Sequence, residues 1–271
     1  MNRTDLGVAL VTGASTGIGR ATARSLKRAG YRVFGTSRKA ADGNPDGITM
    51  LVCDVTDDAS VQKMVAEVIN KAGRIDLLVN NAGIGVVGGA EESSFEQCRS
   101  IFETNVFGCI RIIKAVLPHM RSQGEGRIIN ISSVLGRIPA PFMALYSATK
   151  HALEGYSESM DHEIRKFNVR SILIEPAYTK TNFDQNSVMA DRPLSIYEKA
   201  RNGMIELTRQ AMTTADAADV VAKTVVKAAT ALKPRVRYTS GSLAAKIVTM
   251  RRFVPEALYD SGVRKTFRLD E

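Results

Sequence analysis

The chain has 271 residues, of which 44% are hydrophobic and 24% are charged, the composition of an ordinary globular protein. It contains no run of about 18 apolar residues, no CxxC pair and no cluster of cysteine with histidine, which argues against a transmembrane helix, a disulfide framework and a metal site. The net charge of +9 suits an anionic small molecule, a membrane surface or nucleic acid, so charge alone excludes none of these partners.

Short apolar segments rich in β-branched residues alternate with segments of helical periodicity along most of the chain. Strands are predicted at residues 7–13, 31–37, 48–54, 75–83, 126–133 and 169–176. Helices are predicted at residues 18–30, 59–73 and about 95–121, around the stretch 141–155, and from about residue 214. Near-continuously apolar strands separated by helices are typical of a parallel sheet covered on both faces. We therefore predict one domain over residues 1–271, with an α/β fold built on a Rossmann-type doubly wound sheet.

A glycine-rich turn, in the sequence TGASTGIGRA, follows the first predicted strand directly. Gly13, Gly17 and Gly19 have the spacing G-x-x-x-G-x-G at a strand-to-helix junction, where a Cβ atom would obstruct the approach of a phosphate. The N-terminus of the following helix offers free N–H groups and the positive end of its dipole to a pyrophosphate. The turn therefore predicts a dinucleotide site, although glycines also occur in turns for purely structural reasons.

The end of the second predicted strand indicates which dinucleotide is bound. Folds that take NAD place an acidic residue there, which binds the ribose hydroxyls. This chain has the sequence TSRK at residues 36–39 instead, and the guanidinium of Arg38 can pair with a 2′-phosphate beside the small hydroxyl of Ser37. We therefore expect NADP(H) rather than NAD(H), and a solvated surface arginine is the alternative.

Asp54, after the third strand, either binds the adenine amino group or caps the following turn.

Tyr146 and Lys150 stand four residues apart near the start of a predicted helix. Because the chain has seven tyrosines, such a pair arises by chance roughly one time in three, so the spacing alone is weak evidence. Further motifs surround it in order: TGASTGIG at residues 12–19, Asp54, NNAG at residues 80–83, Asn105, Ser133, the Tyr146 and Lys150 pair, and the segment 176–181. With these motifs in register over residues 6–182, the chain resembles the short-chain dehydrogenase/reductase family in its shorter soluble form. Its later segments are most similar to the hydroxysteroid and retinol dehydrogenase-like branch.

The resemblance implies catalytic roles for four residues. Tyr146 would be the general acid in carbonyl reduction and the base in alcohol oxidation, with Lys150 stabilising its anion and holding the nicotinamide ribose. Ser133 would polarise the substrate carbonyl, so that Ser133 and Tyr146 both contact the substrate, and the neighbouring Ser132 is the competing candidate. Asn105 corresponds to an asparagine that helps to hold a water chain behind the lysine.

The resemblance also implies a set of cofactor contacts. NNAG would pack beneath the adenosine, and the segment that begins at Pro176 would end with Thr181 touching the nicotinamide amide. Ala177 replaces the usual glycine of this segment, and a positive φ there would cost an alanine about 1 kcal/mol. The candidate cofactor contacts are Gly13, Ser15, Thr16, Gly17, Ile18, Gly19, Ser37, Arg38, Asp54, Val55, Asn81, Ala82, Gly83, Tyr146, Lys150, Pro176 and Thr181.

Two segments depart from the alternation of strands and helices. Residues 183–213 form a long insertion after the last of these strands, which predicts a substrate lid, and an amphipathic helix covering the sheet edge is the alternative. The apolar residues suited to a lid are Met189, Leu194, Ile196, Tyr197, Met204 and Met212. Residues 234–271 form a C-terminal extension that begins with a predicted strand at 234–241. Basic residues in this extension alternate with apolar ones rather than aromatics, which disfavours nucleic acid and leaves contact with a membrane surface open.

The apolar stretch VLGRIPAPFMAL between Ser133 and Tyr146, together with the lid, favours a hydrophobic ketone, aldehyde or secondary alcohol that is steroid-, retinoid- or lipid-like. The predicted activity is hydride transfer between NADP(H) and such a substrate. The alternative is a non-catalytic NADP(H)-binding sensor of the same fold, which would not need the four catalytic candidates. The resemblance further implies a homodimer or homotetramer. A cytoplasmic location is expected, because the N-terminus has no signal-peptide cleavage pattern.

Overall fold

The computed structural model describes residues 6–39, 45–181, 187–267 and 269. Residues 183–186 of the predicted lid and residues 268, 270 and 271 of the predicted extension lie outside this part of the chain.

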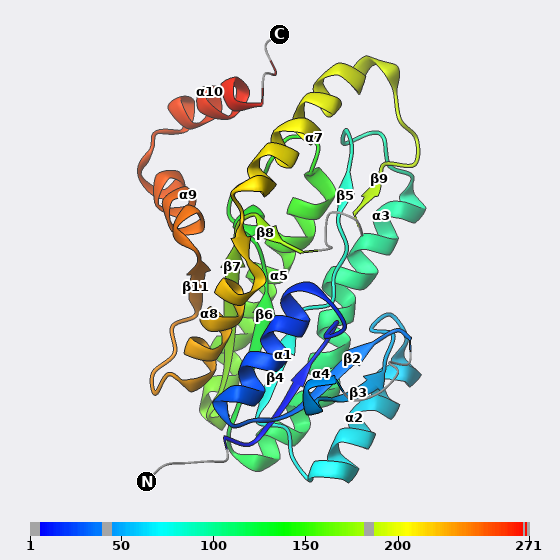
Figure 1. Ribbon diagram of the computed structural model, residues 1–271, viewed down its shortest axis with the longest axis vertical. Coiled ribbons are helices and arrows are strands. Elements are labelled where there is room, and N and C mark those ends of the chain that lie inside the picture. Colours follow the sequence, from blue (N-terminus) through cyan, green and yellow to red (C-terminus); the bar gives the residue numbers. More distant parts are fainter. Residues whose placement is uncertain (1–5, 40–44, 182–186, 268, 270–271) are drawn as a thin grey trace.

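A seven-stranded parallel sheet forms the centre of the protein (Figure 1). Its strand order is β3-β2-β1-β4-β6-β7-β11. The chain adds β2 and β3 toward one edge of the sheet and the later strands toward the other edge, so the order switches between β1 and β4, as in a doubly wound fold. The strands are β1 (Val8–Val11), β2 (Arg32–Ser37), β3 (Thr49–Val52), β4 (Leu77–Asn80), β6 (Gly126–Ile131), β7 (Val169–Pro176) and β11 (Arg237–Ser240). The predicted fold class is confirmed, and every predicted strand is present within its predicted range.

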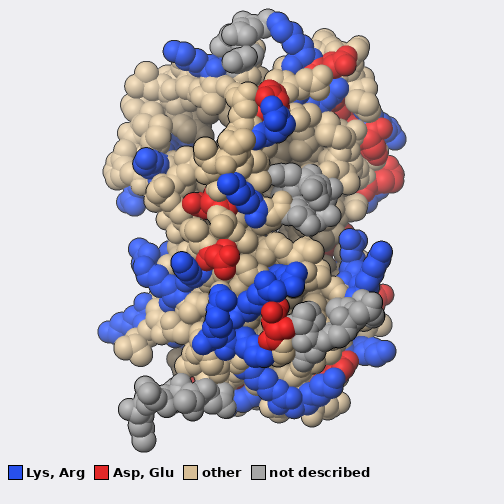
Figure 2. Space-filling view, viewed as in Figure 1, with Lys and Arg blue, Asp and Glu red and all other residues tan. Residues whose placement is uncertain are grey.

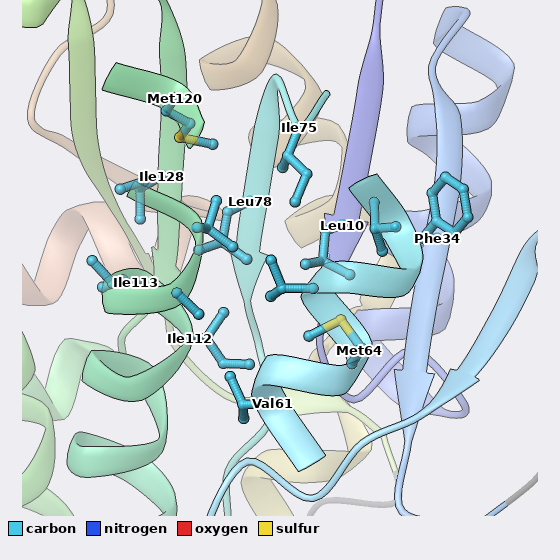
Figure 3. Packing of buried hydrophobic residues seen from close by; sticks show 14 of the residues in the cluster. Leu10, Phe34, Val61, Met64, Ile75, Leu78, Ile112, Ile113, Met120 and Ile128 are labelled. Carbon is cyan, nitrogen blue, oxygen red and sulfur yellow. The ribbon is translucent and has the colours of Figure 1, made fainter. Parts of the chain in front are cut away.

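Helices cover both faces of the sheet. The described helices are α1 (Gly17–Ala29), α2 (Asp58–Ala72), α3 (Phe95–Phe102), α4 (Gly108–Gln123), α5 (Ala144–Ile164), α7 (Glu198–Thr213), α8 (Ala218–Thr230), α9 (Ser242–Phe253) and α10 (Glu256–Thr266). On one face, α2, α4 and α5 bury their apolar stripes against residues such as Leu10 and Leu78 of the sheet (Figure 3). On the other face, α1 and α8 contact each other and pack against the alternate residues of the same strands.

The helical stretch predicted at 95–121 is not one continuous helix. A π-helical turn at Glu103–Phe107 separates α3 from α4. Such turns insert one extra residue into an α-helix and occur frequently at functional sites. The apolar pattern carries through the turn, which is why the sequence did not reveal the interruption.

Two short pairings attach the insertion to the body of the protein. Strand β5 (Val86–Val87) pairs with β9 (Val188–Met189), and β8 (Thr179–Lys180) pairs with β10 (Asp216–Ala217). Each strand has two residues, which is too short for a recognisable alternation in the sequence. Between these pairings, α7 contains most of the described insertion, so the region is largely helical.

Strand β11 joins the C-terminal extension to the edge of the sheet, and Arg237 on this strand contacts buried carboxylates. Its Nε lies 2.9 Å from Oε2 of Glu154 on α5 and 3.5 Å from Oε1 of Glu175 on β7. Nη1 of Arg137 lies 3.4 Å from the same oxygen of Glu175. Glu175 is 1% exposed, and burial together with the nearby charge of Glu154 raises its pKa from 4.5 to about 7.

The raised pKa of Glu175 predicts a pH-dependent cost to stability. In the unfolded chain this carboxyl ionises near pH 4.5, whereas in the folded protein it holds its proton up to about pH 7. The contribution of Glu175 to the free energy of unfolding is therefore fully present below pH 4.5. This contribution falls by about 3 kcal/mol as the pH rises toward 7. We expect Glu175→Gln to unfold at a higher temperature than the wild type at pH 8, with the difference closing as the pH approaches 4.5.

The exposed Glu163→Gln on α5 is the matched control for thermal unfolding across this pH range, because it makes the same chemical change outside the buried cluster. A Glu175→Gln variant that is less stable than the wild type at pH 8 would show that the ion pairs with Arg137 and Arg237 outweigh the burial of the charge.

Candidate active site

A continuous cavity of about 1110 Å³ lies where the parallel strands end. The loops after β1, β2, β3, β4, β6 and β7 line one part of it, and the insertion and the C-terminal helices line the rest. Of the predicted cofactor contacts, every residue except Gly19 lines this cavity. Ser132 and Ser133 line it as well, so the structure brings the glycine turn and the predicted reacting groups into one space.

The glycine turn has the geometry of a phosphate cradle. Gly13 and Gly17 have positive φ values of 64° and 54°, which glycine adopts without strain. α1 begins at Gly17, so its free N–H groups face the cavity, and its first turn carries no acidic residue. Gly19, also a predicted contact, does not line the cavity and is constrained by packing. A Cβ atom there would lie 2.2 Å from the carbonyl oxygen of Gly13, so Gly19 lets the helix pack on the turn.

Asn81 holds this turn in place rather than only lining the cavity. Its side-chain amide donates to the carbonyl oxygens of Thr12, at 3.0 Å, and Gly13, at 3.2 Å. The hydroxyl of Thr12 in turn accepts from the backbone N–H of Asn81, at 2.9 Å, and of Ala82, at 3.1 Å. The ends of β1 and β4 are thus joined by side-chain hydrogen bonds. Thr12 begins the TGASTGIG motif but was not among the predicted contacts, because a threonine before a glycine turn has no special spacing.

The residues after β2 and β3 surround the far end of the cavity. Arg38 is exposed and lines the cavity together with Ser37, whose hydroxyl donates to the carbonyl of Lys39. Oδ1 of Asp54 accepts from the backbone N–H of Thr56, at 2.9 Å, and from its hydroxyl, at 2.8 Å. These hydrogen bonds lower the pKa of Asp54. Of the two predicted roles for Asp54, the turn cap is therefore present.

Tyr146, Ser133 and Lys150 meet at the floor of the cavity. Tyr146 is buried, which raises the pKa of its phenol, whereas a hydrogen bond with Ser133 lowers it. That hydrogen bond favours Ser133 over Ser132 as the partner of the tyrosine. Lys150 is 7% exposed, and its Nζ donates to the carbonyl oxygen of Ile131 at 2.8 Å. Burial lowers the pKa of this lysine, whose Nζ lies 5.5 Å from the centre of the Tyr146 ring.

Asn105 does not line the cavity but holds the groups that do. It lies in the π-helical turn and is buried. Its amide accepts from the backbone N–H of Ile84 and donates to the carbonyl oxygen of the same residue, both at 2.9 Å. It also donates to the hydroxyl of Thr149, at 3.2 Å, which lies between Tyr146 and Lys150 on α5. The arrangement makes Asn105 a positioning residue for the start of α5.

The segment after β7 also forms part of the cavity wall. Pro176, Ala177 and Thr181 line it. Thr181 lies against the glycine turn, because a Cβ atom on Gly17 would lie 3.1 Å from its Cβ. Ala177 is not among the described non-glycine residues with positive φ, so the expected cost of alanine at this position does not arise.

The apolar part of the cavity comes from three segments. Residues 134–143 contribute a wall beside Tyr146, as predicted, and the insertion contributes Met189, Met204 and Met212. The other three predicted lid residues, Leu194, Ile196 and Tyr197, do not line the cavity. The third segment was missed by the sequence analysis: α9, α10 and the residue after them contribute Ile247, Met250, Val254, Leu258, Val263 and Phe267. Their helical spacing is the signal that could have identified this wall.

A buried ion pair fixes the insertion over the cavity. The carboxylate of Glu92 is fully buried and accepts from Arg201 on α7, from the backbone N–H of Leu194 at 2.7 Å and from that of Gly89 at 2.5 Å. Removing one partner of such a pair leaves an uncompensated buried charge, which costs about 3–5 kcal/mol. The described part of the insertion is therefore anchored in the position seen here.

Two curated proteins similar to this chain have names that state a substrate. The 3-ketodihydrosphingosine reductase of Bacteroides thetaiotaomicron is 42% identical over 210 residues, which cover 72% of this chain and 78% of that protein. Human retinol dehydrogenase 8 is 38% identical over 188 residues, which cover 65% of this chain and 60% of that protein.

Solved structures share the fold over nearly the whole chain. The crystal structure of a short-chain dehydrogenase from Streptomyces avermitilis matches with a TM-score of 0.84 at 31% identity and full coverage of both chains. Two structures at 25% identity contain different cofactors. A protein from Burkholderia phymatum is in complex with NAD (TM-score 0.79; 93% of this chain, 95% of that chain), and one from Burkholderia cenocepacia is in complex with NADP (TM-score 0.75; 95% and 98%).

The model of the short chain dehydrogenase family matches residues 7–192, which include the glycine turn, Ser133, Tyr146 and Lys150. This match and the relatives above confirm the resemblance inferred from the motifs: the chain belongs to the short-chain dehydrogenase family of oxidoreductases and has retinol dehydrogenases among its relatives.

Proposed function

We propose that this protein transfers a hydride between NADP(H) and the carbonyl carbon of a hydrophobic ketone or aldehyde, or the corresponding alcohol. The observation that carries the proposal is the meeting of Ser133, Tyr146 and Lys150 in the cavity that the glycine turn also lines. A sensor that only bound the dinucleotide would need the glycine turn but not a buried serine–tyrosine pair beside a buried lysine.

The residues fit a nicotinamide dinucleotide. The open N-terminus of α1 and the turn at Gly13 and Gly17 offer N–H groups to a pyrophosphate, and Thr181 lies beside them at the end that leads to Tyr146. When bound, the reduced nicotinamide supplies the hydride. Side chains of the protein carry out the remaining steps.

In the direction of reduction, the substrate carbonyl oxygen accepts hydrogen bonds from the hydroxyls of Ser133 and Tyr146. Because burial keeps the Tyr146 phenol protonated, it is ready to give its proton to the oxygen as negative charge develops there. The ammonium of Lys150, held by the carbonyl of Ile131, stabilises the phenolate that remains. In the direction of oxidation the same phenolate accepts the proton of the alcohol.

The preference for NADP(H) rests on Arg38. Its exposed guanidinium lies at the cavity beside Ser37, and no carboxylate occupies residues 36–39 to bind ribose hydroxyls. The two cofactor-bound relatives hold NAD and NADP respectively, so family membership alone leaves the choice open.

The apolar walls and the relatives support a proposal for the substrate class. Methionines of α7 and apolar residues of α9 and α10 line the same cavity, and such a lining suits a hydrophobic ligand. The names of the two curated relatives refer to a long-chain base and a retinoid, both with a reacting oxygen on an extended hydrocarbon. We infer that this chain takes a lipid-like carbonyl compound of that kind, with steroids as the next class.

The location and assembly of the protein are also proposals. No helix in the described part of the chain is long and apolar enough to cross a membrane. All three cysteines are unpaired, and Cys53 and Cys109 are buried, which suits a reducing compartment such as the cytoplasm. A homodimer or homotetramer is proposed from the family alone.

The catalytic proposal leads to a prediction for Tyr146. We expect Tyr146→Phe to lower kcat by about 10²–10⁴-fold, because the general acid is lost while the ring still fills its place. NADPH affinity, followed by nicotinamide fluorescence, should stay within about twofold, and Tyr156→Phe on the same helix is the control. The assay follows NADPH absorbance with a long-chain 3-keto base, retinal and a ketosteroid. Tight NADPH binding by the wild type without turnover of any of them would favour the sensor.

A further prediction concerns the choice between NADPH and NADH. We expect Arg38→Leu to weaken NADPH binding by about 10–100-fold, the loss typical of hydrogen bonds to a charged group, and to leave NADH binding unchanged. Isothermal titration with both cofactors measures the two affinities. Arg99→Leu, an exposed arginine on α3 outside the cavity, is the matched control. Equal affinity of the wild type for the two cofactors would overturn the assignment.

A further inference from the structure

The C-terminal helices α9 and α10 contact the rest of the protein sparsely. Figure 1 shows both helices standing apart from the sheet, beyond the end of β11. α9 contacts β11 and the short helical turn at Val134–Gly136, whereas α10 has no extensive contact with another element of the described chain. Between these helices and α7 the surface is hollowed (Figure 2).

The side of α9 and α10 that faces the hollow is apolar. Ile247, Met250 and Val254 recur at helical spacing on α9 and its end, and Leu258 and Val263 continue the apolar lining on α10. Two of these residues are also largely open to solvent, since Met250 is 56% and Leu258 67% exposed. Met250 and Leu258 therefore belong both to the outer surface of the protein and to the lining of the cavity that holds Tyr146.

The outer surface of the same helices combines aromatic and basic side chains. Residues 242–266 carry five basic and two acidic side chains, a net charge of +3. Phe253 is 72% exposed, and the guanidinium of Arg252 lies 5.5 Å from the centre of its ring. Arg251 lies 4.9 Å from the centre of the Tyr259 ring and so joins the end of α9 to α10. Arginines with apolar stems beside exposed rings can place the rings among lipid tails and the charges at the level of phosphates.

We propose that α9 and α10 dock on an anionic phospholipid surface, with Phe253 and Leu258 inserted into the interface and Arg251, Arg252, Arg264 and Lys265 contacting lipid phosphates. The charge of the helices is complementary to such a surface. Because the exposed Met250 and Leu258 also line the cavity, we expect a lipid-like substrate to reach Tyr146 from this side, and this second point rests on the proposed function. An acidic protein would be complementary to the charges but not to an apolar surface that leads into the cavity.

Vesicle sedimentation with the full-length protein tests the docking without substrate or cofactor. We expect binding to vesicles of phosphatidylcholine mixed with phosphatidylserine to be at least about tenfold tighter than to phosphatidylcholine alone, and to weaken with added salt. The double variant Arg252→Glu/Phe253→Ser should lose this binding by at least about tenfold. Its thermal unfolding, NADPH affinity and turnover of a short water-soluble ketone should match the wild type.

The matched control is Lys223→Glu/Phe95→Ser, which makes the same changes of charge and apolar surface at exposed sites on α8 and α3. Equal loss of binding in this control, or no preference of the wild type for anionic vesicles, overturns the proposal. A change in oligomeric state caused by the double variant, seen by analytical ultracentrifugation in the absence of vesicle binding, would assign the surface to a second copy of the chain instead. Because the assay needs no turnover, a failure of docking is distinguishable from a failure of the proposed activity.

Discussion

A buried ammonium group constrains the arrangement of this site. Nζ of Lys150 lies in the floor of the cavity and donates to the carbonyl of Ile131, so its charge is removed from water and needs compensation from fixed neighbours. That compensation requires α5 to hold one position relative to β6. At the far end of α5, the fully buried Asp161 accepts from Arg165, Arg170 and the backbone N–H of Ser171, which joins the helix to β7. Asn105 fixes the near end through Thr149. The helix that carries Tyr146 and Lys150 is thus held at both ends by polar contacts.

Much of the fold and of the site floor could be predicted from the sequence, because each depended on a local pattern. Buried parallel strands are continuous apolar runs, and the glycine turn needs glycine at Gly13 and Gly17 for its backbone conformation. Tyr146 and Lys150 lie one helical turn apart, so their proximity follows from helix geometry once the helix is recognised. Ser133 was placed by its spacing in the family pattern, and its contact with Tyr146 is a tertiary one that the sequence alone does not contain.

The features that escaped prediction depend on how backbone and side chains pack in space, even where the partners are close in the sequence. Gly19 was taken for a phosphate contact, yet its constraint is the carbonyl of Gly13, which only the packed helix brings near. The two roles of Asp54 were indistinguishable until Thr56 was seen to donate to it twice. The apolar lining on α9 and α10 had a helical period, but nothing in the sequence showed that these helices would fold back toward the cavity rather than cover the sheet.

The insertion on one side of the cavity and α9 with α10 on the other are held with very different strength, and this difference indicates which of them moves at the lower cost in free energy. Moving the insertion would separate Glu92 from Arg201, which exposes a buried charge to water or leaves it buried without its partner. It would also break the pairing of β5 with β9. Moving α9 and α10 breaks few contacts, because β11 is anchored through Arg237 while the helices beyond it are sparsely packed. Local opening requires least free energy where buried contacts are few. The cavity therefore opens most readily on the side of α9 and α10, which is the side where exposed apolar and basic residues lie together.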